Sequence, residues 1–126
     1  MATLTAIFFI SIIPLRTPHL VLSNGHTGAV LLRRGVGEGG GFSVSYIHSL
    51  NISLVTEIYE IREGKIVLTA LEEGGTRIEG FDRAMDSVSY MIGYTTEHTL
   101  VLGEEQIRLD ALDLAGQPVR FDLRRQ

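Results

Sequence analysis

Residues 42–61 read FSVSYIHSLNISLVTEIYEI, and this stretch decides the class of fold. In residues 42–49, one set of alternate positions holds Phe, Val, Tyr and His, and the other set holds three serines and one Ile. A period of two with aromatic and β-branched residues predicts a strand that is half buried. Residues 53–61 have the same character, so they predict an antiparallel partner in a hairpin that turns around residues 51 and 52.

The same pattern continues on both sides of this stretch. Further strands are predicted at 19–23, 29–34, 66–71, 87–95, 98–102, 106–109 and 118–124, most of them separated by turns rich in Gly, Asn or Glu. No segment has a convincing helical period, and the best candidates, 81–85 and 110–114, are about one turn each. We therefore expect an all-β fold: a single small sandwich or partly open barrel of about eight or nine antiparallel strands, rich in hairpins.

Composition limits the class of protein. The chain has 126 residues, 44% of them hydrophobic and 21% charged, which fits one globular domain and excludes a disordered or polytopic membrane protein. A formal net charge of −4 argues against a basic nucleic-acid-binding surface. The absence of cysteine excludes disulfides and thiolate chemistry.

The start of the chain differs from the rest. Residues 2–15 carry no charge, and this run is shorter than the roughly 20 residues that span a bilayer as a helix. We interpret residues 1–17 as a secretory leader or membrane anchor, with a buried first strand as the alternative. Residues 18–126 then form one all-β domain, exported or membrane-anchored on the extracytoplasmic side, although the sequence leaves a cytoplasmic location open.

A glycine-rich segment follows the first predicted hairpin. Gly35, Gly37 and Gly40 match the spacing G-x-G-x-x-G. In a dinucleotide site this motif opens a helix, whose N-terminus binds the pyrophosphate. Here a strand is expected next, so we interpret the segment as a connection between strands and expect no nucleotide cofactor.

His48 and Glu57 are the titratable residues of most interest. Alternation puts His48 on the face of Tyr46, and Glu57 on the face of Tyr59 in the next strand. In a hairpin the two can be cross-strand or diagonal neighbours, and a carboxylate beside an imidazole can orient it for acid–base work or for a polar ligand. A structural pair that fixes the register is the favoured interpretation. Ser49 points to the opposite face, which argues against a Ser–His nucleophile.

No metal site is expected. His19, His26 and His98 are scattered, and the acidic residues at 79, 82 and 86 lack the spacing of a calcium loop. We interpret those acids as solvated surface.

The Tyr46-x-His48-Ser49 strand, followed after a short interval by Glu57-x-Tyr59, resembles the bacterial and archaeal family called domain of unknown function 1850. The resemblance covers most of residues 21–123. It departs from the family at 50–57, LNISLVTE, which keeps the Glu but lacks a Pro, and a downstream Gly-x-Gly-Leu segment is not recognisable. The resemblance implies an exported accessory protein of tripartite solute transporters, and it makes Tyr46, His48, Ser49, Glu57 and Tyr59 the candidate ligand or polar-pair site.

Three functions follow from these observations. The first is an extracytoplasmic accessory or binding module linked to a membrane transporter component. The second is a structural β domain that forms homo-oligomers through its strand edges. The third is a small hydrolase or isomerase that uses His48 and Glu57. We favour the first, without a catalytic role, a cofactor or a nucleic-acid partner.

Overall fold

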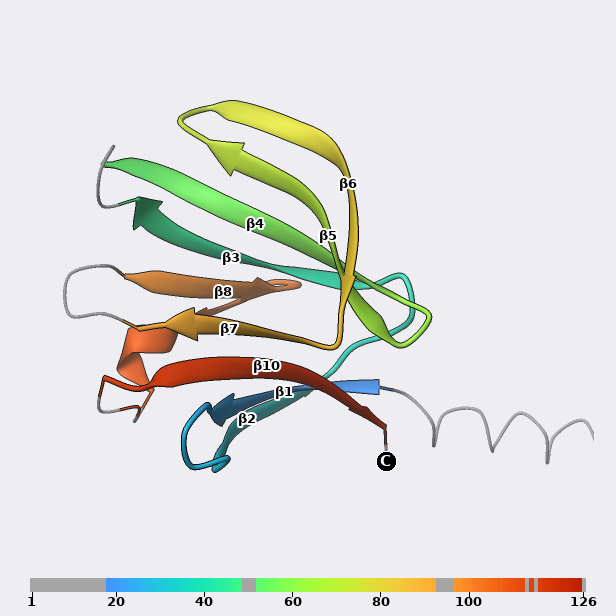
Figure 1. The fold of residues 1–126 in the computed structure, drawn as a ribbon, viewed down its shortest axis with the longest axis vertical. Coiled ribbons are helices and arrows are strands. Elements are labelled where there is room, and N and C mark those ends of the chain that lie inside the picture. The colour runs from blue at the N-terminus through green and yellow to red at the C-terminus, as the bar shows by residue number, and fades with distance from the viewer. Residues whose placement is uncertain (1–17, 49–51, 93–96, 113, 115, 126) are drawn as a thin grey trace, which may run out of the picture.

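The computed structural model describes residues 18–48, 52–92, 97–112, 114 and 116–125. They form two antiparallel sheets that pack face to face and do not close into a barrel (Figure 1). The strands are β1 (Pro18–Asn24), β2 (Val30–Gly35), β3 (Gly41–His48), β4 (Ser53–Arg62), β5 (Lys65–Glu73), β6 (Thr76–Met85), β7 (Ser87–Met91), β8 (His98–Leu102), β9 (Glu105–Arg108) and β10 (Pro118–Arg125). A single 3₁₀ turn, η2 (Leu109–Ala111), follows β9.

The strand order shows how the chain builds the sandwich. One sheet has the order β2-β1-β10-β7, and the other has the order β6-β5-β4-β3-β8-β9. The predicted all-β sandwich of antiparallel strands is therefore confirmed. The hairpins β1–β2, β3–β4, β4–β5 and β8–β9 all form, whereas the pairs β1–β10 and β3–β8 join segments that are distant in sequence.

Ten strands are present in the described part, rather than eight or nine. The additional strand is β6, and residues 81–85, one of the two best candidates for a helical turn, continue this strand instead. Beyond Gly80, which has a φ of 91°, the strand carries charged residues and pairs with β5 through a register shift. Pairing with β5, rather than the pattern of its own sequence, holds it extended. The second suspected turn, at 110–114, begins within η2.

Alternation along the strands fills the interior. Leu20 and Phe121 from one sheet and Val44 and Leu100 from the other are completely buried. Removal of each such side chain from water contributes about 1.5–3 kcal/mol to folding. Phe121 stacks on Phe42 across the interior with ring centroids 5.6 Å apart, so aromatic packing joins the two sheets.

The register of the β3–β4 hairpin decides which side chains face the interior. Phe42 lies opposite Tyr59, Val44 opposite Glu57, and Tyr46 opposite Val55. Since directly opposed residues share a face, Glu57 belongs to the same face as the buried Val44. The hairpin therefore carries a carboxylate on the inner surface of the six-stranded sheet.

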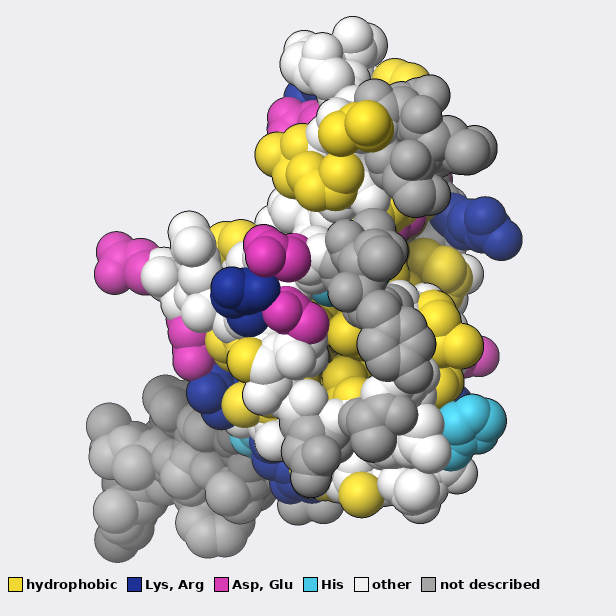
Figure 2. All heavy atoms as spheres, turned by 90° about the vertical axis from the view of Figure 1, so that its left-hand side faces the viewer, with side chains coloured by type: hydrophobic (Ala, Val, Ile, Leu, Met, Phe, Trp, Pro, Cys, Tyr) yellow, Lys and Arg dark blue, Asp and Glu magenta, His cyan; other side chains and the backbone are white. Residues whose placement is uncertain are grey.

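The surface mixes charged and apolar side chains. Seen from the side on which β7 ends, hydrophobic side chains reach the surface in the upper part of the molecule, and acidic and basic ones lie close together near them (Figure 2). Ile52, Leu54 and Met91 are the most exposed large hydrophobic residues among those described. The first 17 residues, and with them the predicted leader or anchor, lie outside the described residues. In the part that is described, no helix is long and apolar enough to cross a bilayer.

Candidate functional site

Glu57 is a half-buried acidic residue on the inner face of β4. It lies between Val44 of β3 and Leu71 of β5, so both of its cross-strand neighbours are apolar. A carboxylate in such a position loses hydration and requires hydrogen-bond donors from the protein. Those donors come from tyrosine side chains.

Tyr90 of β7 supplies the first donor. Its hydroxyl donates a hydrogen bond of 2.8 Å to Oε1 of Glu57, and a hydrogen bond of 2.5 Å joins the same hydroxyl to that of Tyr59. A phenol has only one proton to donate. Because Tyr90 gives its proton to Glu57, Tyr59 is the donor to Tyr90, and the three side chains form a chain that runs from Tyr59 to Tyr90 to Glu57.

Tyr46 and His98 extend this group toward β8. Tyr46 is half-buried, and its pKa is raised by burial first and then by the charge of Glu57 and a hydrogen bond with it. The ring of His98 stacks on Tyr46 at a centroid distance of 5.0 Å and lies 5.8 Å from the ring of Tyr90. We call Tyr46, Glu57, Tyr59, Tyr90 and His98 the tyrosine–glutamate cluster.

The buried tyrosines of this cluster do not ionise easily. Burial raises the pKa of both Tyr59 and Tyr90 far above the ordinary tyrosine value of 10.0, and the charge of Glu57 adds to the effect in each case. Both phenols therefore stay protonated across the physiological range. They can hold Glu57 in position, but they cannot serve as general bases there.

Three of the five predicted site residues come together, namely Tyr46, Glu57 and Tyr59. In the hairpin register His48 is paired with Ser53, whereas Glu57 is paired with Val44. Four residues of strand separate the two positions, or about 13 Å. The expectation that His48 and Glu57 are cross-strand or diagonal neighbours is therefore wrong, because the register separates the two residues along the strand direction. Ser49 lies outside the described residues.

An open pocket of about 280 Å³ adjoins the cluster, between the inner face of β4–β6 and strand β7. Its charged lining residues are Glu57 and Arg83. The others are Tyr59, Leu68, Met85, Ser87, Val88, Ser89 and Tyr90. β7 is an edge strand of its sheet, so the pocket occupies the open margin of the sandwich.

Tyr90, His98 and Arg83 were not among the predicted site residues. Tyr90 shares a face with Val88 in the alternating run 87–91, and a tyrosine on an apolar face is the one signal that could have marked it. The sequence distinguishes His98 only as one of several scattered histidines. No feature of the sequence around Arg83 marks it as a site residue, because the pairing of β6 with β5 places it beside the pocket.

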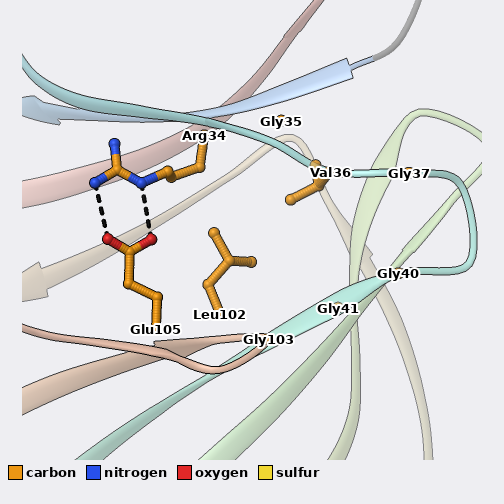
Figure 3. A pocket seen from close by; sticks show the side chains of 9 residues that line it. All are labelled: Arg34, Gly35, Val36, Gly37, Gly40, Gly41, Leu102, Gly103 and Glu105. Carbon is orange, nitrogen blue, oxygen red and sulfur yellow. Dashed lines mark hydrogen bonds and ion pairs between the residues drawn. The ribbon is translucent and has the colours of Figure 1, made fainter.

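The glycine-rich segment forms a second pocket, of about 440 Å³ (Figure 3). Strand β3 begins at Gly41, directly after the motif, so the predicted connection between strands is confirmed and no helix follows it. Arg34 closes one side of the pocket through two hydrogen bonds to Glu105, of 2.8 and 2.9 Å. This ion pair leaves the guanidinium already matched to a carboxylate.

The acidic residues considered for a hard cation each contact a basic residue. Asp82 lies 3.2 Å from Arg62, Glu79 lies 2.7 Å from Arg77, and Asp86 contacts Lys65. No group of three or more His, Cys, Asp or Glu residues within the described segments is arranged to hold a metal ion.

The comparisons with known proteins identify no relative of this chain. A scan against protein-family models, a search of curated proteins and a search of solved structures each found no match. The resemblance to domain of unknown function 1850 therefore stays a prediction from the residues quoted above.

Proposed function

We propose that this chain is a binding module that holds a small organic solute in the pocket between β4–β6 and β7. The proposal rests on the burial and the hydrogen bonding of the Glu57 side chain. Its carboxylate is half-buried and held by the Tyr90 hydroxyl, and it forms no ion pair with a basic side chain in the described part of the chain. A fixed carboxylate at the wall of an open pocket is a suitable group to receive a donor from a ligand.

Binding fits this site better than catalysis does. The two buried phenols keep their protons, because their pKa values are raised. The strand register separates His48 from Glu57, so the proposed hydrolase or isomerase pair has no support from the hairpin. A carboxylate, two phenols that keep their protons and an apolar wall are suitable groups to position a ligand.

The proposal extends to an exported accessory role beside a membrane solute transporter. Two sequence features support it: the uncharged run at 2–15 and the resemblance at Tyr46, His48 and Glu57. Cell fractionation with N-terminal sequencing of the mature chain tests it. Recovery outside the cytoplasm supports the exported role, and an intact cytoplasmic chain overturns it.

Self-association through strand edges receives less support. The edge strand β6 carries charges of both signs at Arg77, Glu79, Asp82 and Arg83. Charged side chains on an edge oppose pairing with a second sheet. Sedimentation that shows a monomer at all concentrations would remove this alternative.

Fragment screening by NMR tests the binding function directly. Methyl signals of Leu68, Met85 and Val88 report on the pocket, and those of Leu31 in β2 serve as the internal reference. We expect a subset of small solutes to shift the pocket methyls and leave the reference unchanged. If no solute shifts the pocket methyls selectively, the proposed function is wrong.

A further inference from the structure

Glu57 and Arg83 lie diagonally across the inner face of one sheet. Tyr59, Leu68 and Arg83 are paired directly from β4 through β5 to β6. Glu57 lies two residues before Tyr59 on the same strand face, so it is in the adjacent row. Neighbouring strands are about 4.8 Å apart, which puts the two charged residues on β strands about 10 Å apart.

The two side chains have opposite charges and line one pocket. Glu57 uses Oε1 to accept the Tyr90 hydrogen bond, and a carboxylate has further acceptor positions. Arg83 is exposed and forms no ion pair with an acidic residue in the segments that the structure describes. Its guanidinium offers a planar array of donors that suits a carboxylate.

Apolar side chains occupy the space between these charges. Leu68, Met85 and Val88 line the pocket together with the hydroxyl-bearing Ser87 and Ser89. The pocket volume of about 280 Å³ is at the small end for a ligand site, which favours a solute over a peptide or a larger cofactor. A solute that fits all of these walls has a cationic end, an anionic end and an aliphatic part.

We infer that the ligand is a small zwitterion of the amino-acid class, with its ammonium group at Glu57 and its carboxylate at Arg83. This inference rests on the proposed binding function and names its ligand class. The aliphatic part of the ligand packs on Leu68 and Met85. Each charged end meets a protein group of opposite sign, so a solute that lacks either end leaves one charged side chain without a partner.

Calorimetric titration of the full chain tests the inference with four probes that share one aliphatic skeleton. L-Leucine carries both charges, 3-methylbutylamine carries only the ammonium, 4-methylpentanoate carries only the carboxylate, and 3-methylbutanol carries neither. We expect L-leucine to bind at least about tenfold more tightly than each of the other three, because each charged hydrogen bond contributes that much.

Substitutions then assign each end of the ligand. Glu57→Gln and Arg83→Gln should each weaken L-leucine binding about tenfold or more, and Arg83→Gln should leave 3-methylbutylamine binding unchanged. Glu104→Gln, in the exposed β8–β9 turn, and Arg77→Gln, on the opposite face of β6, are the matched controls and should change nothing. Arg83 is exposed, so Arg83→Gln retains the fold, and its result stands even if Glu57→Gln does not fold.

The outcomes separate the ligand class from the function itself. If 3-methylbutanol shifts the pocket methyls as strongly as L-leucine does, the pocket binds solutes and the zwitterion inference is wrong. If none of the four probes, and no fragment, reaches the pocket, both proposals are wrong. If Arg77→Gln weakens binding as much as Arg83→Gln, only the net charge matters and the assignment of the carboxylate to Arg83 is overturned.

Discussion

Tyr90 donates a hydrogen bond of 2.8 Å to Glu57, and this bond crosses from the four-stranded sheet to the six-stranded one. Tyr59 completes the arrangement by donating to Tyr90. The interior of the sandwich therefore contains one directional polar chain within an aromatic and aliphatic core. Such a chain favours a single packing of the two sheets, because any slippage between them would leave buried polar atoms without partners.

Substitution of Tyr90 by Phe tests the importance of this chain. Tyr90→Phe removes the donor to Glu57 and the acceptor for Tyr59 at once, while the ring and its contacts remain. We expect the free energy of unfolding to fall by about 1–3 kcal/mol, the cost of a buried polar group that loses its partner. Urea denaturation followed by circular dichroism measures the change.

Tyr59→Phe is the matched control. Tyr59 stands at the donor end of the chain, so its loss leaves the bond between Tyr90 and Glu57 in place. The expected decrease in stability is about 0.5–1.5 kcal/mol, smaller than for Tyr90→Phe. Equal losses in the two variants would contradict the direction of the chain, because Tyr90 would then lose no more than the residue at its donor end.

The raised tyrosine pKa values predict a loss of stability at alkaline pH. In the unfolded chain a tyrosine loses its proton near pH 10, whereas Tyr59 and Tyr90 keep theirs in the fold because burial raises their pKa. The folded state then binds more protons than the unfolded state. Stability is therefore fully present below about pH 10 and decreases as the pH rises above it.

The slope of this decrease identifies the groups responsible. Each buried tyrosine contributes about 1.4 kcal/mol per pH unit above the unfolded pKa. Denaturation curves at a series of pH values from about 9 to about 11 give the free energy of unfolding at each pH. Above about pH 10 this free energy should decrease less steeply with pH for Tyr59→Phe than for the original chain, by up to about that amount. Identical slopes would contradict the assignment of the alkaline transition to the tyrosine–glutamate cluster.

Local patterns accounted for most of the fold. Alternation from Phe42 to Tyr46 and the turn residues Asn24 and Gly25 are properties of short segments, and they predicted the strands and hairpins correctly. Strand β6 was not predicted, because its extended conformation depends on pairing with β5. The pairing of β1 with β10 could not be predicted either, because nothing in either strand specifies a partner about 100 residues away.

Only those residues of the site that belong to one hairpin were predicted from the sequence. Tyr46, Glu57 and Tyr59 belong to one hairpin, so alternation was enough to place them on one face. Tyr90 and Arg83 reach them only through the packing of the sheets and the β5–β6 register, which no local pattern encodes. The pairing of His48 with Glu57 failed because alternation fixes the face of a residue but not its level along the hairpin.

Gly41 predicts a sharp difference within the glycine-rich segment. A Cβ atom at Gly41 would collide with the backbone carbonyl oxygen of Tyr59, whereas one at Gly35 would meet nothing within 4 Å. We expect Gly41→Ala to reduce stability by about 1–3 kcal/mol, because the β3–β4 backbones have to separate. Gly35→Ala should be neutral or stabilising by up to about 1 kcal/mol. Thermal unfolding of both variants checks the contrast, and equal melting temperatures would contradict the close backbone approach.

The ion pair of Arg34 and Glu105 predicts a salt-sensitive link between the two sheets. Arg34 belongs to β2 and Glu105 to β9, and both side chains are about 40% exposed. The hydrogen bond from Arg34 lowers the pKa of Glu105, so the contribution of the pair is present above the ordinary carboxyl range and is lost as the pH falls through that lowered pKa.

A double-mutant cycle of Arg34→Gln and Glu105→Gln measures this link. We expect a favourable coupling at about 0.05 M NaCl that shrinks at about 1 M, because salt screens exposed charges. The coupling should also decrease at acidic pH, where Glu105 becomes neutral. A coupling that salt and acid leave unchanged would mean that packing of the two side chains, and not their charges, joins β2 to β9 at the mouth of the glycine-rich pocket.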